Sequence, residues 1–535
     1  MLEYTRYAHG CVFGLRILIV TGKLAEPIIK KMLKKALPHE VDVIALPVTV
    51  AALANTELIA NYLKGLGIDC KKYDLIMIPG ASMGSAKAIE KELGVKAVKG
   101  PLQASDLPLV LSLEEIPKLS PDEPADKVLE DELQTASKKM LESLEKSLIE
   151  KEHIIVGNII VPTLPPPIRV MAEITEAHTL SKDALLKKAN KLISEGAEIL
   201  SIGFEAGVSR PEKVRETIRL LKKELQMPIA VDSIIPSEII AGTEAGADMV
   251  LSLEAGNIEK VAKYVEDIPS VVIAYDSRSS VMPKTAQEKL KLLETNISEA
   301  IRLGVKKVIA DPILDPINST STFQSLLAYH RFKEKYKNTP TLMGIGNVVE
   351  LLDADTVGSN ALMVMLALEL GVSIVLVVEK SPKAQYSTLE ASIASKMASL
   401  AWLKKSPPKD LGIDLLILKD KRKVETPLET EGATVVEAAK EEAKYELDPL
   451  GVFKIRVNHD EECIEALYIG KKGKILIKGK TARAIRDEIL RRGLISSLSH
   501  AFYLGIELSK AEEALTIGKN YIQEKPLFTR KTIDM

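Results

Sequence analysis

Residues 228–252 read PIAVDSIIPSEIIAGTEAGADMVLS, which is a strand, a helix and the next strand in succession. The first apolar run, Pro228–Asp232, ends in an acidic residue, and a helical pattern starts near Pro236. The second apolar run covers Ala247–Ser252. Short apolar runs joined by longer helical patterns are typical of parallel strands that are buried on both faces. The stretch therefore predicts one βα unit of an α/β fold.

The same alternation continues on both sides of this unit, from residue 168 onward. Six further candidate strands are Arg169–Ile174, Glu198–Gly203, Ser270–Tyr275, Lys307–Asp311, Thr341–Ile345 and Val372–Val378. Eight βα units in about 240 residues match the size and rhythm of a (β/α)8 TIM barrel. An open doubly wound sheet is the alternative, because periodicity alone does not show whether a sheet closes.

A short hairpin is expected immediately before the barrel. The apolar runs Ile154–Val156 and Ile159–Val161 flank Gly157-Asn158, which is a two-residue hairpin signal. The proline-rich run that follows, Pro162–Pro167, cannot continue a helix or the interior of a sheet. We expect this hairpin to close the barrel floor.

Smaller domains are expected on either side of the barrel. Residues 1–152 contain strand, Gly/Ser loop and helix units at Leu15–Val20 and Tyr73–Pro79, which predict a Rossmann-like doubly wound domain. The barrel takes residues 153–408, and residues 409–535 predict a small α+β domain. It contains an apolar run at Leu415–Leu418. Its expected strands are Val452–Val457 and Glu465–Tyr468, and its expected helices are Thr434–Tyr445, Thr481–Arg492 and Ile495–Leu515.

Composition excludes several classes of protein. The 535 residues carry a formal charge of −2 with both signs interspersed, which is unlike a nucleic-acid binder. Cys11, Cys70 and Cys463 lie far apart without CxxC spacing, so we expect no disulfide framework and no metal site. The longest apolar stretch, Ala361–Val378, is interrupted by Glu369 and Gly371, and no export signal precedes the first domain. We expect a cytoplasmic protein without membrane or nucleic-acid partners.

Polar residues at the carboxyl ends of the strands are the candidate site, because barrel enzymes place functional groups there. They are Glu173, Glu176, Ser201, Glu205, Asp232, Ser233, Ser252, Glu254, Asp276, Asp311 and Asn347, with Asn257 close by in sequence. Carboxylates and amides suit a ligand rich in N–H donors, such as the edge of a 2-amino-4-oxo pterin. A phosphorylated sugar would need a glycine-rich cradle, of which Gly344 and Gly346 offer only a weak version.

Four segments resemble the pterin-binding superfamily, which includes dihydropteroate synthases and the methyltetrahydrofolate and methyltetrahydromethanopterin methyltransferases. They are residues 228–233, 245–250, 311–316 and 344–349, and they follow one another at the expected strand ends. The resemblance implies that Asp232 binds the pterin and that Asp311 belongs to the strand-six Asp-Pro element. It also implies that Asn347 hydrogen-bonds near N5, the atom that bears the one-carbon unit. The last two segments are closer to the methyltransferases than to the synthases.

The sequence departs from the synthase pattern where basic groups are expected. The synthase lysine after strand seven is missing from the turn Asn347-Val348-Val349, and Leu376 and Val378 stand where strand eight carries arginine and histidine. The strand-four asparagine of both branches is replaced by Leu251 or Ser252. The three-domain layout resembles an archaeal group described as dihydropteroate synthase-related.

The resemblance therefore implies a transferase that uses a tetrahydromethanopterin or tetrahydrofolate type of pterin, with methyl transfer from N5. The alternatives are condensation of a hydroxymethylpterin diphosphate with an arylamine, and a non-catalytic pterin-binding scaffold for a corrinoid or other partner protein. A homodimer is the default assembly. Asn347 and Asp311 are the expected catalytic residues, and the pterin-binding set is Asp232, Asp311, Asn347, Glu173, Glu205, Ser252 and Asn257.

Three other features have simpler interpretations. The loop Gly80–Ser85 could cradle a phosphate, but it lacks the Gly-Lys-Ser/Thr ending, so a plain βα turn is favoured. His178 follows the first barrel strand and could face the pocket. His500 begins an amphipathic helix, where core packing or capping is expected rather than binding of a corrinoid.

Overall fold

The computed structural model describes residues 14–33, 39–49, 54–111, 116, 119–128, 130–279, 282–319, 321–419, 432–438 and 447–528. The chain divides into two compact units. The first comprises Met1–Val378 and Tyr386–Leu416, and the second comprises Glu379–Gln385 and Ile417–Met535. Within the described ranges, every helix is too short or too polar to cross a membrane.

The first unit opens with a parallel four-stranded sheet in the order β2-β1-β3-β4. Its strands are β1 (Arg16–Thr21), β2 (Glu40–Ala45), β3 (Leu75–Ile78) and β4 (Ala97–Lys99), and its helices are α1 (Glu26–Met32), α2 (Thr56–Gly65), α3 (Lys87–Leu93), α4 (Leu107–Val110), α5 (Ala125–Val128) and α6 (Glu130–Ser147). Alternate residues of β1 enter different cores: Leu18 and Val20 pack in one cluster, and Ile17 and Ile19 in another. Burial of both faces of β1 is typical of a doubly wound sheet.

The loop Gly80–Ser85 behaves as a tight βα turn. A Cβ on Gly80 would lie 2.5 Å from the carbonyl oxygen of Gly100, so only glycine allows this close approach of two backbones. The helix that follows, α3, has only seven residues. These features account for the glycine without any ligand.

All eight expected barrel strands are present and lie in one parallel sheet of the order β12-β11-β10-β9-β8-β7-β14-β13. A parallel bridge between Ala310 and Thr341 joins the two ends of this sheet, so it closes into a barrel. The strands are β7 (Arg169–Ile174), β8 (Ile199–Gly203), β9 (Ile229–Asp232), β10 (Met249–Leu253), β11 (Ser270–Ile273), β12 (Val308–Asp311), β13 (Leu342–Gly344) and β14 (Ile374–Val378).

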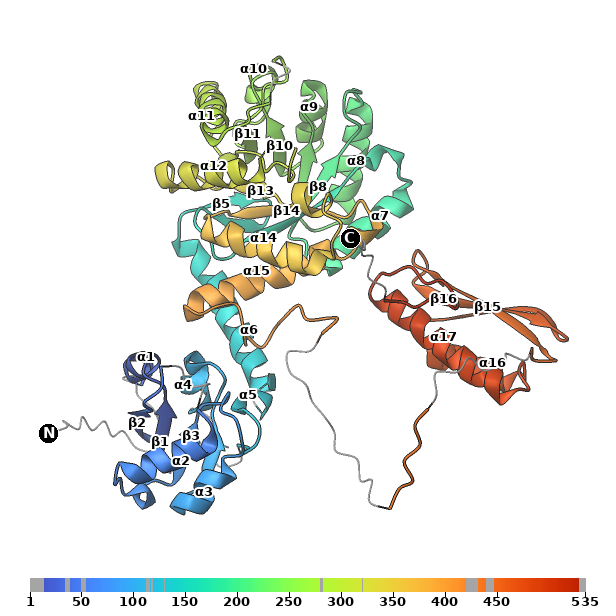
Figure 1. Ribbon diagram of the computed structural model, residues 1–535. Coiled ribbons are helices and arrows are strands. Elements are labelled where there is room, and N and C mark those ends of the chain that lie inside the picture. Colours follow the sequence, from blue (N-terminus) through green and yellow to red (C-terminus); the bar gives the residue numbers. More distant parts are fainter. Residues whose placement is uncertain are drawn as a thin grey trace. The chain divides into compact units, whose positions relative to one another are not determined.

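Helices surround these strands, as Figure 1 shows for α8, α9, α11, α12 and α14. The barrel helices are α7 (Lys182–Ser194), α8 (Pro211–Glu224), α9 (Pro236–Glu244), α10 (Ile258–Val261), α11 (Ala286–Arg302), α12 (Thr322–Lys335), α13 (Gly346–Val349), α14 (Thr356–Glu369) and α15 (Ser387–Lys404). Local sequence sets several of their starts. Thr285 and Glu288 form a reciprocal capping box at α11, and Ser181 and Ser321 cap α7 and α12.

The barrel interior is apolar at its floor. Every strand contributes at least one inward-facing side chain to a single buried cluster: Met171, Ile199, Ala230, Met249, Leu251, Val271, Ile309, Leu342 and Ile374. The hairpin of β5 (His153–Val156) and β6 (Ile159–Pro162) adds Val156 and Val161 to the same cluster. The predicted closure of the floor by this hairpin is confirmed.

The second unit contains an antiparallel sheet of β15 (Gly451–Asn458), β16 (Cys463–Gly470) and β17 (Gly473–Gly479), with helices α16 (Ala482–Arg491) and α17 (Leu498–Thr516). Two predicted strands and two predicted helices of this region are confirmed, and β17 was missed. The apolar run Leu415–Leu418 forms neither a helix nor a strand, and Leu416, Ile417 and Leu418 are exposed. Residues 434–438 of the predicted helix Thr434–Tyr445 are not helical, and residues 439–445 lie outside the described ranges.

His500 is a buried core residue of this unit. Its ring nitrogen Nδ1 lies 3.1 Å from Oδ2 of Asp448, and its ring contacts those of Phe453 and Tyr503. The Asp448 carboxylate also accepts hydrogen bonds from Leu450 N and from Ser496 and Ser497. These bonds outweigh burial and hold the pKa of Asp448 below its usual value. The interpretation of His500 as a core residue is confirmed.

Candidate functional site

The open end of the barrel collects acidic side chains directly above the apolar floor. Glu173, Asp232 and Asp311 each lie two residues beyond a floor residue of the same strand, so strand alternation turns them inward. Glu173 passes over β8, where a Cβ on Gly203 would lie 2.6 Å from Glu173 Oε1. Glycine at residue 203 therefore makes room for the carboxyl group of Glu173.

Asp232 ends β9 and is joined to its neighbour on β10. Ser252 Oγ donates a 2.9 Å hydrogen bond to Asp232 Oδ1. The β10–β11 register shifts between Val250 and Leu253, and Ser252 has a φ of +71°. A bulge of this kind re-aims a side chain at a cost of about 1–3 kcal/mol in backbone strain. Burial raises the pKa of Asp232, and the hydrogen bond from Ser252 opposes that rise.

Asn257 holds this bulge in place. Its Nδ2 donates to Ser252 O at 2.9 Å and to Ile234 O at 3.1 Å, and its Oδ1 accepts from Glu254 N at 2.9 Å. The side chain is only 1 % exposed. Both amide protons are therefore committed to backbone carbonyls, so Asn257 acts on the site through the β9 and β10 loops and does not itself reach a ligand.

The Glu254 carboxylate also binds other loops of the protein. Its carboxylate accepts hydrogen bonds from Ser277 N and Oγ, both at 2.8 Å, and from Gly256 N at 2.9 Å. These bonds join the loop after β10 to the loop after β11. The sequence does not distinguish Glu254 from Glu173 and Glu205, whereas the structure shows that Glu254 is a buried anchor between two loops.

Asp311 ends β12 and is 9 % exposed. Tyr329 OH donates to its Oδ1 at 2.5 Å, and Ile313 N donates to the same oxygen at 2.7 Å. Oδ2 has no hydrogen-bond partner among the described residues, so it is the oxygen left for a ligand. Burial raises the pKa of Asp311 to about 6, although the bonds from Tyr329 and Ile313 oppose the rise.

The two aspartates act on one another. The charge of Asp232 contributes to raising the pKa of Asp311, so both carboxyl groups lie in the same electrostatic environment. They come from strands that are three places apart in the eight-stranded order. A ligand with several N–H donors would remove the repulsion between them and satisfy their open oxygens.

Asn347 lies in α13 and is exposed. Its Nδ2 donates a 3.0 Å hydrogen bond to Leu314 O, in the loop that follows Asp311. The amide therefore ties the turn after β13 to the loop after β12. One N–H and Oδ1 remain for a ligand, because Asn347 makes no other side-chain hydrogen bond within the described ranges.

Glu205 lies on the rim rather than with the inward aspartates. It accepts hydrogen bonds from Arg210 at 2.6 and 3.2 Å, and its Oε2 lies 3.6 Å from His178 Nε2. The bond from Arg210 lowers the pKa of Glu205. A hollow of about 340 Å³ is lined by His178, Arg210, Pro211, Glu212 and Lys213. Its two basic residues, Arg210 and Lys213, were missed from the sequence because they follow a strand end by several residues.

Two further residues near Asp311 were also missed. Tyr329 and Lys289 are both 0 % exposed, and both come from helices rather than strand ends. Lys289 shares the buried face of α11 with Leu293, Asn296 and Ala300. A lysine on an otherwise buried helical face is a signal that the sequence did contain.

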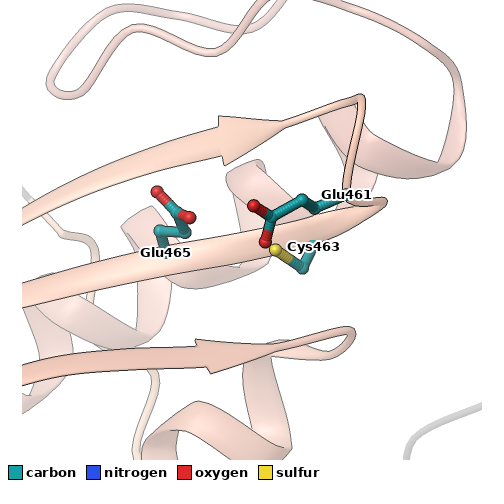
Figure 2. A group of neighbouring side chains, drawn as sticks. All are labelled: Glu461, Cys463 and Glu465. Atoms are coloured by element: carbon teal, nitrogen blue, oxygen red, sulfur yellow. The ribbon is translucent and has the colours of Figure 1, made fainter. Parts of the chain in front are cut away.

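A possible metal cluster in the second unit is already neutralised by cations. Glu461, Cys463 and Glu465 bring their ligand atoms within 4.8 Å of one another, as Figure 2 shows at the start of β16. Lys478 Nζ lies 2.6 Å from Glu461 and 3.0 Å from Glu465, and Arg456 also binds Glu465. Burial and the two carboxylates raise the pKa of the Cys463 thiol. A metal ion would have to displace two cations and a proton.

Comparison with known proteins assigns the barrel to a class. The family described as "Pterin binding enzyme" matches residues 173–378. The flanking regions match a "Family of unknown function (DUF6513)" over residues 15–102 and the family "PterinBD-DUF4346" over residues 447–524. A dihydropteroate synthase of Streptococcus pyogenes is 26 % identical over 135 residues, which are 23 % of this chain and 50 % of that protein. The protein is a member of the pterin-binding superfamily.

A second relative matches the chain over nearly its full length and shows the family to which it belongs. The uncharacterized protein MJ0107 of Methanocaldococcus jannaschii is 35 % identical over 530 residues, which are 96 % of this chain and 99 % of that protein. The chain belongs to the same family as this archaeal protein. Among solved structures, the dihydropteroate synthase of Coxiella burnetii in complex with pteroic acid is 20 % identical, with a TM-score of 0.39, over 47 % of this chain and 99 % of that chain.

Proposed function

We propose that the barrel binds a reduced pterin of the tetrahydromethanopterin or tetrahydrofolate type and transfers a methyl group from its N5. The observation that carries this proposal is the arrangement of Asp311, whose Oδ1 takes two protein hydrogen bonds while Oδ2 remains open. An open carboxylate oxygen at the mouth, with Asp232 nearby, suits the N–H donors of the 2-amino-4-oxo edge. Glu173 and Ser252 complete the wall on the β7 and β10 sides.

In the proposed reaction the N5–methyl bond breaks and a bond forms between the methyl carbon and a nucleophilic acceptor. The electron pair of the broken bond returns to N5, so a proton delivered to N5 favours the departing amine. Asn347 can direct its remaining N–H, or a water that it binds, toward that atom. Asp311, whose pKa is raised to about 6, is mostly ionised at neutral pH and accepts the N–H donors of the ring through its open oxygen. Fixing the ring on both aspartates supplies the positioning that such transfers need.

In this proposal, a corrinoid carried by a partner protein is a suitable methyl acceptor. The alternative is a non-catalytic complex with that partner. Such a scaffold would bind the pterin through the same residues without turnover. Labelled methyl transfer from the methylated pterin to an added acceptor separates the two. Homodimerisation of the barrel remains part of the proposal and would be measured by sedimentation.

Condensation of a hydroxymethylpterin diphosphate with an arylamine is the second candidate. Against it, Leu376 packs with the inward-facing cluster and the Val378 side chain lies near Gly346, so β14 offers no cation to a diphosphate. In its favour, Arg210 and Lys213 line a hollow at the carboxyl end of β8. A condensation assay with the Arg210→Ala variant would test this candidate directly.

The binding test is calorimetric titration with tetrahydromethanopterin, its methylated form and tetrahydrofolate. Asp232→Asn and Asn347→Ala are the test variants, and Asp276→Asn is the matched control. Asp276 also follows a strand but pairs with Arg278 at 2.9 Å on the rim. Loss of about tenfold or more in affinity with Asp232→Asn is expected, with no change for the control. Unchanged binding by both test variants would refute the site, and no binding by the unaltered protein would refute the pterin.

A further inference from the structure

The loop that follows Asp311 is held by side chains along its whole length. Four consecutive backbone carbonyls, those of residues 312–315, each accept a hydrogen bond from a side chain of another element. The donors are Lys289 Nζ to Pro312 O (3.4 Å) and Ile313 O (3.1 Å), Asn347 Nδ2 to Leu314 O (3.0 Å), and Thr322 Oγ1 to Asp315 O (3.0 Å). Contacts from α11, α12 and α13 therefore hold the conformation of this loop.

Lys289 is the centre of this arrangement. It is 0 % exposed, and its ammonium group lies 3.0 Å from Oδ2 of Asp315, which is itself 4 % exposed. Ser325 Oγ donates to the same carboxylate oxygen at 3.1 Å. A buried ion pair contributes little net stability compared with apolar residues of the same size. Its presence on the apolar face of α11 therefore calls for a role other than stability.

The geometry connects Lys289 to Asp311 through one peptide group. The peptide between Pro312 and Ile313 carries both the carbonyl that Lys289 binds and the N–H that donates to Asp311 Oδ1 at 2.7 Å. Because a peptide is planar, fixing its carbonyl on one side aims its N–H on the other. Ile313 has a φ of +65°, a left-handed conformation that a β-branched residue adopts only when its surroundings impose it.

We propose that Lys289 is a positioning residue of the pterin site. It holds the two peptide groups that flank Ile313, so that Asp311 presents its open Oδ2 to the ligand. The inference rests on the proposed pterin binding and extends it to a residue that does not touch the pterin. Asp315 keeps the ammonium group in place, and Asn347 holds the next carbonyl of the same loop. The site is therefore preorganised before the ligand arrives.

Lys289 also acts on Asp311 by its charge. The groups that face Asp311 are Lys289 from α11, Tyr329 from α12 and Asp232 from β9. Burial and Asp232 raise the pKa of Asp311, whereas Lys289, Tyr329 and Ile313 N lower it. The N–H donors of a pterin require the ionised carboxylate, so binding should weaken as pH falls through this pKa. Removing the ammonium group should move that midpoint to higher pH, which a purely structural role would not do.

The test measures the affinity for tetrahydromethanopterin and tetrahydrofolate between about pH 5 and pH 8. The variants are Lys289→Met, the double variant Lys289→Met/Asp315→Asn, and Lys291→Met as the control, an exposed lysine of the same helix. The double variant removes both buried charges together, so it leaves no unpaired carboxylate, and thermal unfolding checks that it folds. We expect both test variants to bind at least about tenfold more weakly, with a raised pH midpoint, and the control to match the unaltered protein.

Two results would count against the inference, and they differ from one another. If the unaltered protein and the folded double variant bind with equal affinity and the same pH midpoint, Lys289 has no positioning role and the pterin site stands. If the unaltered protein binds neither pterin at any pH, the proposed function fails and this inference fails with it.

Discussion

The loops beside the two aspartates at the barrel mouth are fixed by different kinds of interaction. Next to Asp232, a neutral amide fixes the strained bulge of β10, because Asn257 bonds the carbonyls of Ser252 and Ile234. Beyond Asp311, a buried ion pair fixes the loop, because Lys289 bonds Asp315 and the carbonyl of Ile313. Both loops contain a non-glycine residue with positive φ, Ser252 in one and Ile313 in the other.

This difference shows how a fold can give two similar carboxyl groups different proton affinities. The Asn257 amide next to Asp232 carries no charge. Burial therefore raises the pKa of Asp232, and only the hydrogen bond from Ser252 opposes that rise. Burial also raises the pKa of Asp311, but the hydrogen bonds from Tyr329 and Ile313 N and the charge of the Lys289 ammonium group partly offset that rise. The first loop is fixed by geometry alone, whereas the second is fixed by geometry and tuned by charge.

The ionic loop should give the largest loss of stability when one partner is removed. Lys289→Met leaves Asp315 buried without its counter-ion, and breaking a buried pair in this way costs about 3–5 kcal/mol. Chemical denaturation of Lys289→Met and of the exposed control Lys291→Met measures the difference. A loss within about 0.5 kcal/mol of the control would mean that water or a rearrangement already compensates Asp315.

The next effect is the pH dependence of stability that Asp311 contributes. Its pKa in the folded protein is about 6, above its usual value of 3.8, so the folded state binds its proton more tightly than the unfolded chain. The stability from this group is therefore fully present below about pH 4 and lost as pH rises through about 6, a change of about 3 kcal/mol. Asp311→Asn should lack this loss, as unfolding free energies between those pH values would show.

Asp276→Asn provides a control of opposite sign. The hydrogen bond from Arg278 lowers the pKa of Asp276, so its contribution is present at neutral pH and lost on acidification. If Asp311→Asn and the unaltered protein keep a constant difference in unfolding free energy across the range, the burial of Asp311 does not raise its pKa.

The barrel was predictable because each of its strands is a short apolar run between helical patterns. Pro228–Asp232 and Lys307–Asp311 differ from the observed β9 and β12 by one residue at the start. The second unit was less regular. β17 was missed, and the apolar run Leu415–Leu418 forms no strand, because short apolar runs such as these do not show whether a partner strand exists.

The candidate site was predictable only in part. Strand alternation places Glu173, Asp232 and Asp311 inward, and a sequence shows that alternation directly. It does not show hydrogen-bond partners, so Asn257, which is fully engaged by the backbone, could not be told from Asn347, which is exposed. Lys289 and Tyr329 were missed because they reach Asp311 from helices, through contacts that depend on how those helices pack.

The neutral loop should lose less stability than the ionic loop. Asn257→Ala leaves Glu254 N and the carbonyls of Ser252 and Ile234 without their partner, which should cost about 2 kcal/mol. Asn190→Ala, which removes an exposed amide bonded only to Leu186 O, is the control. If Asn257→Ala lowers the free energy of unfolding as much as Lys289→Met, the distinction between a loop held by neutral hydrogen bonds and a loop held by an ion pair is wrong.

The smallest effect tests the strain in the bulge itself. Ser252→Ala and Ser252→Gly both lose the hydrogen bond to Asp232, but only glycine relieves the positive φ, so Ser252→Gly should be about 1 kcal/mol the more stable of the two. Ser201 lies within β8, where its buried Oγ has no hydrogen-bond partner among the described residues and its φ is not positive. There the order should reverse, with alanine about 0.5–1 kcal/mol more stable than glycine, because a strand interior penalises glycine. The same order at both residues would show that the bulge stores no strain, and that Asn257 holds a conformation which Ser252 adopts freely.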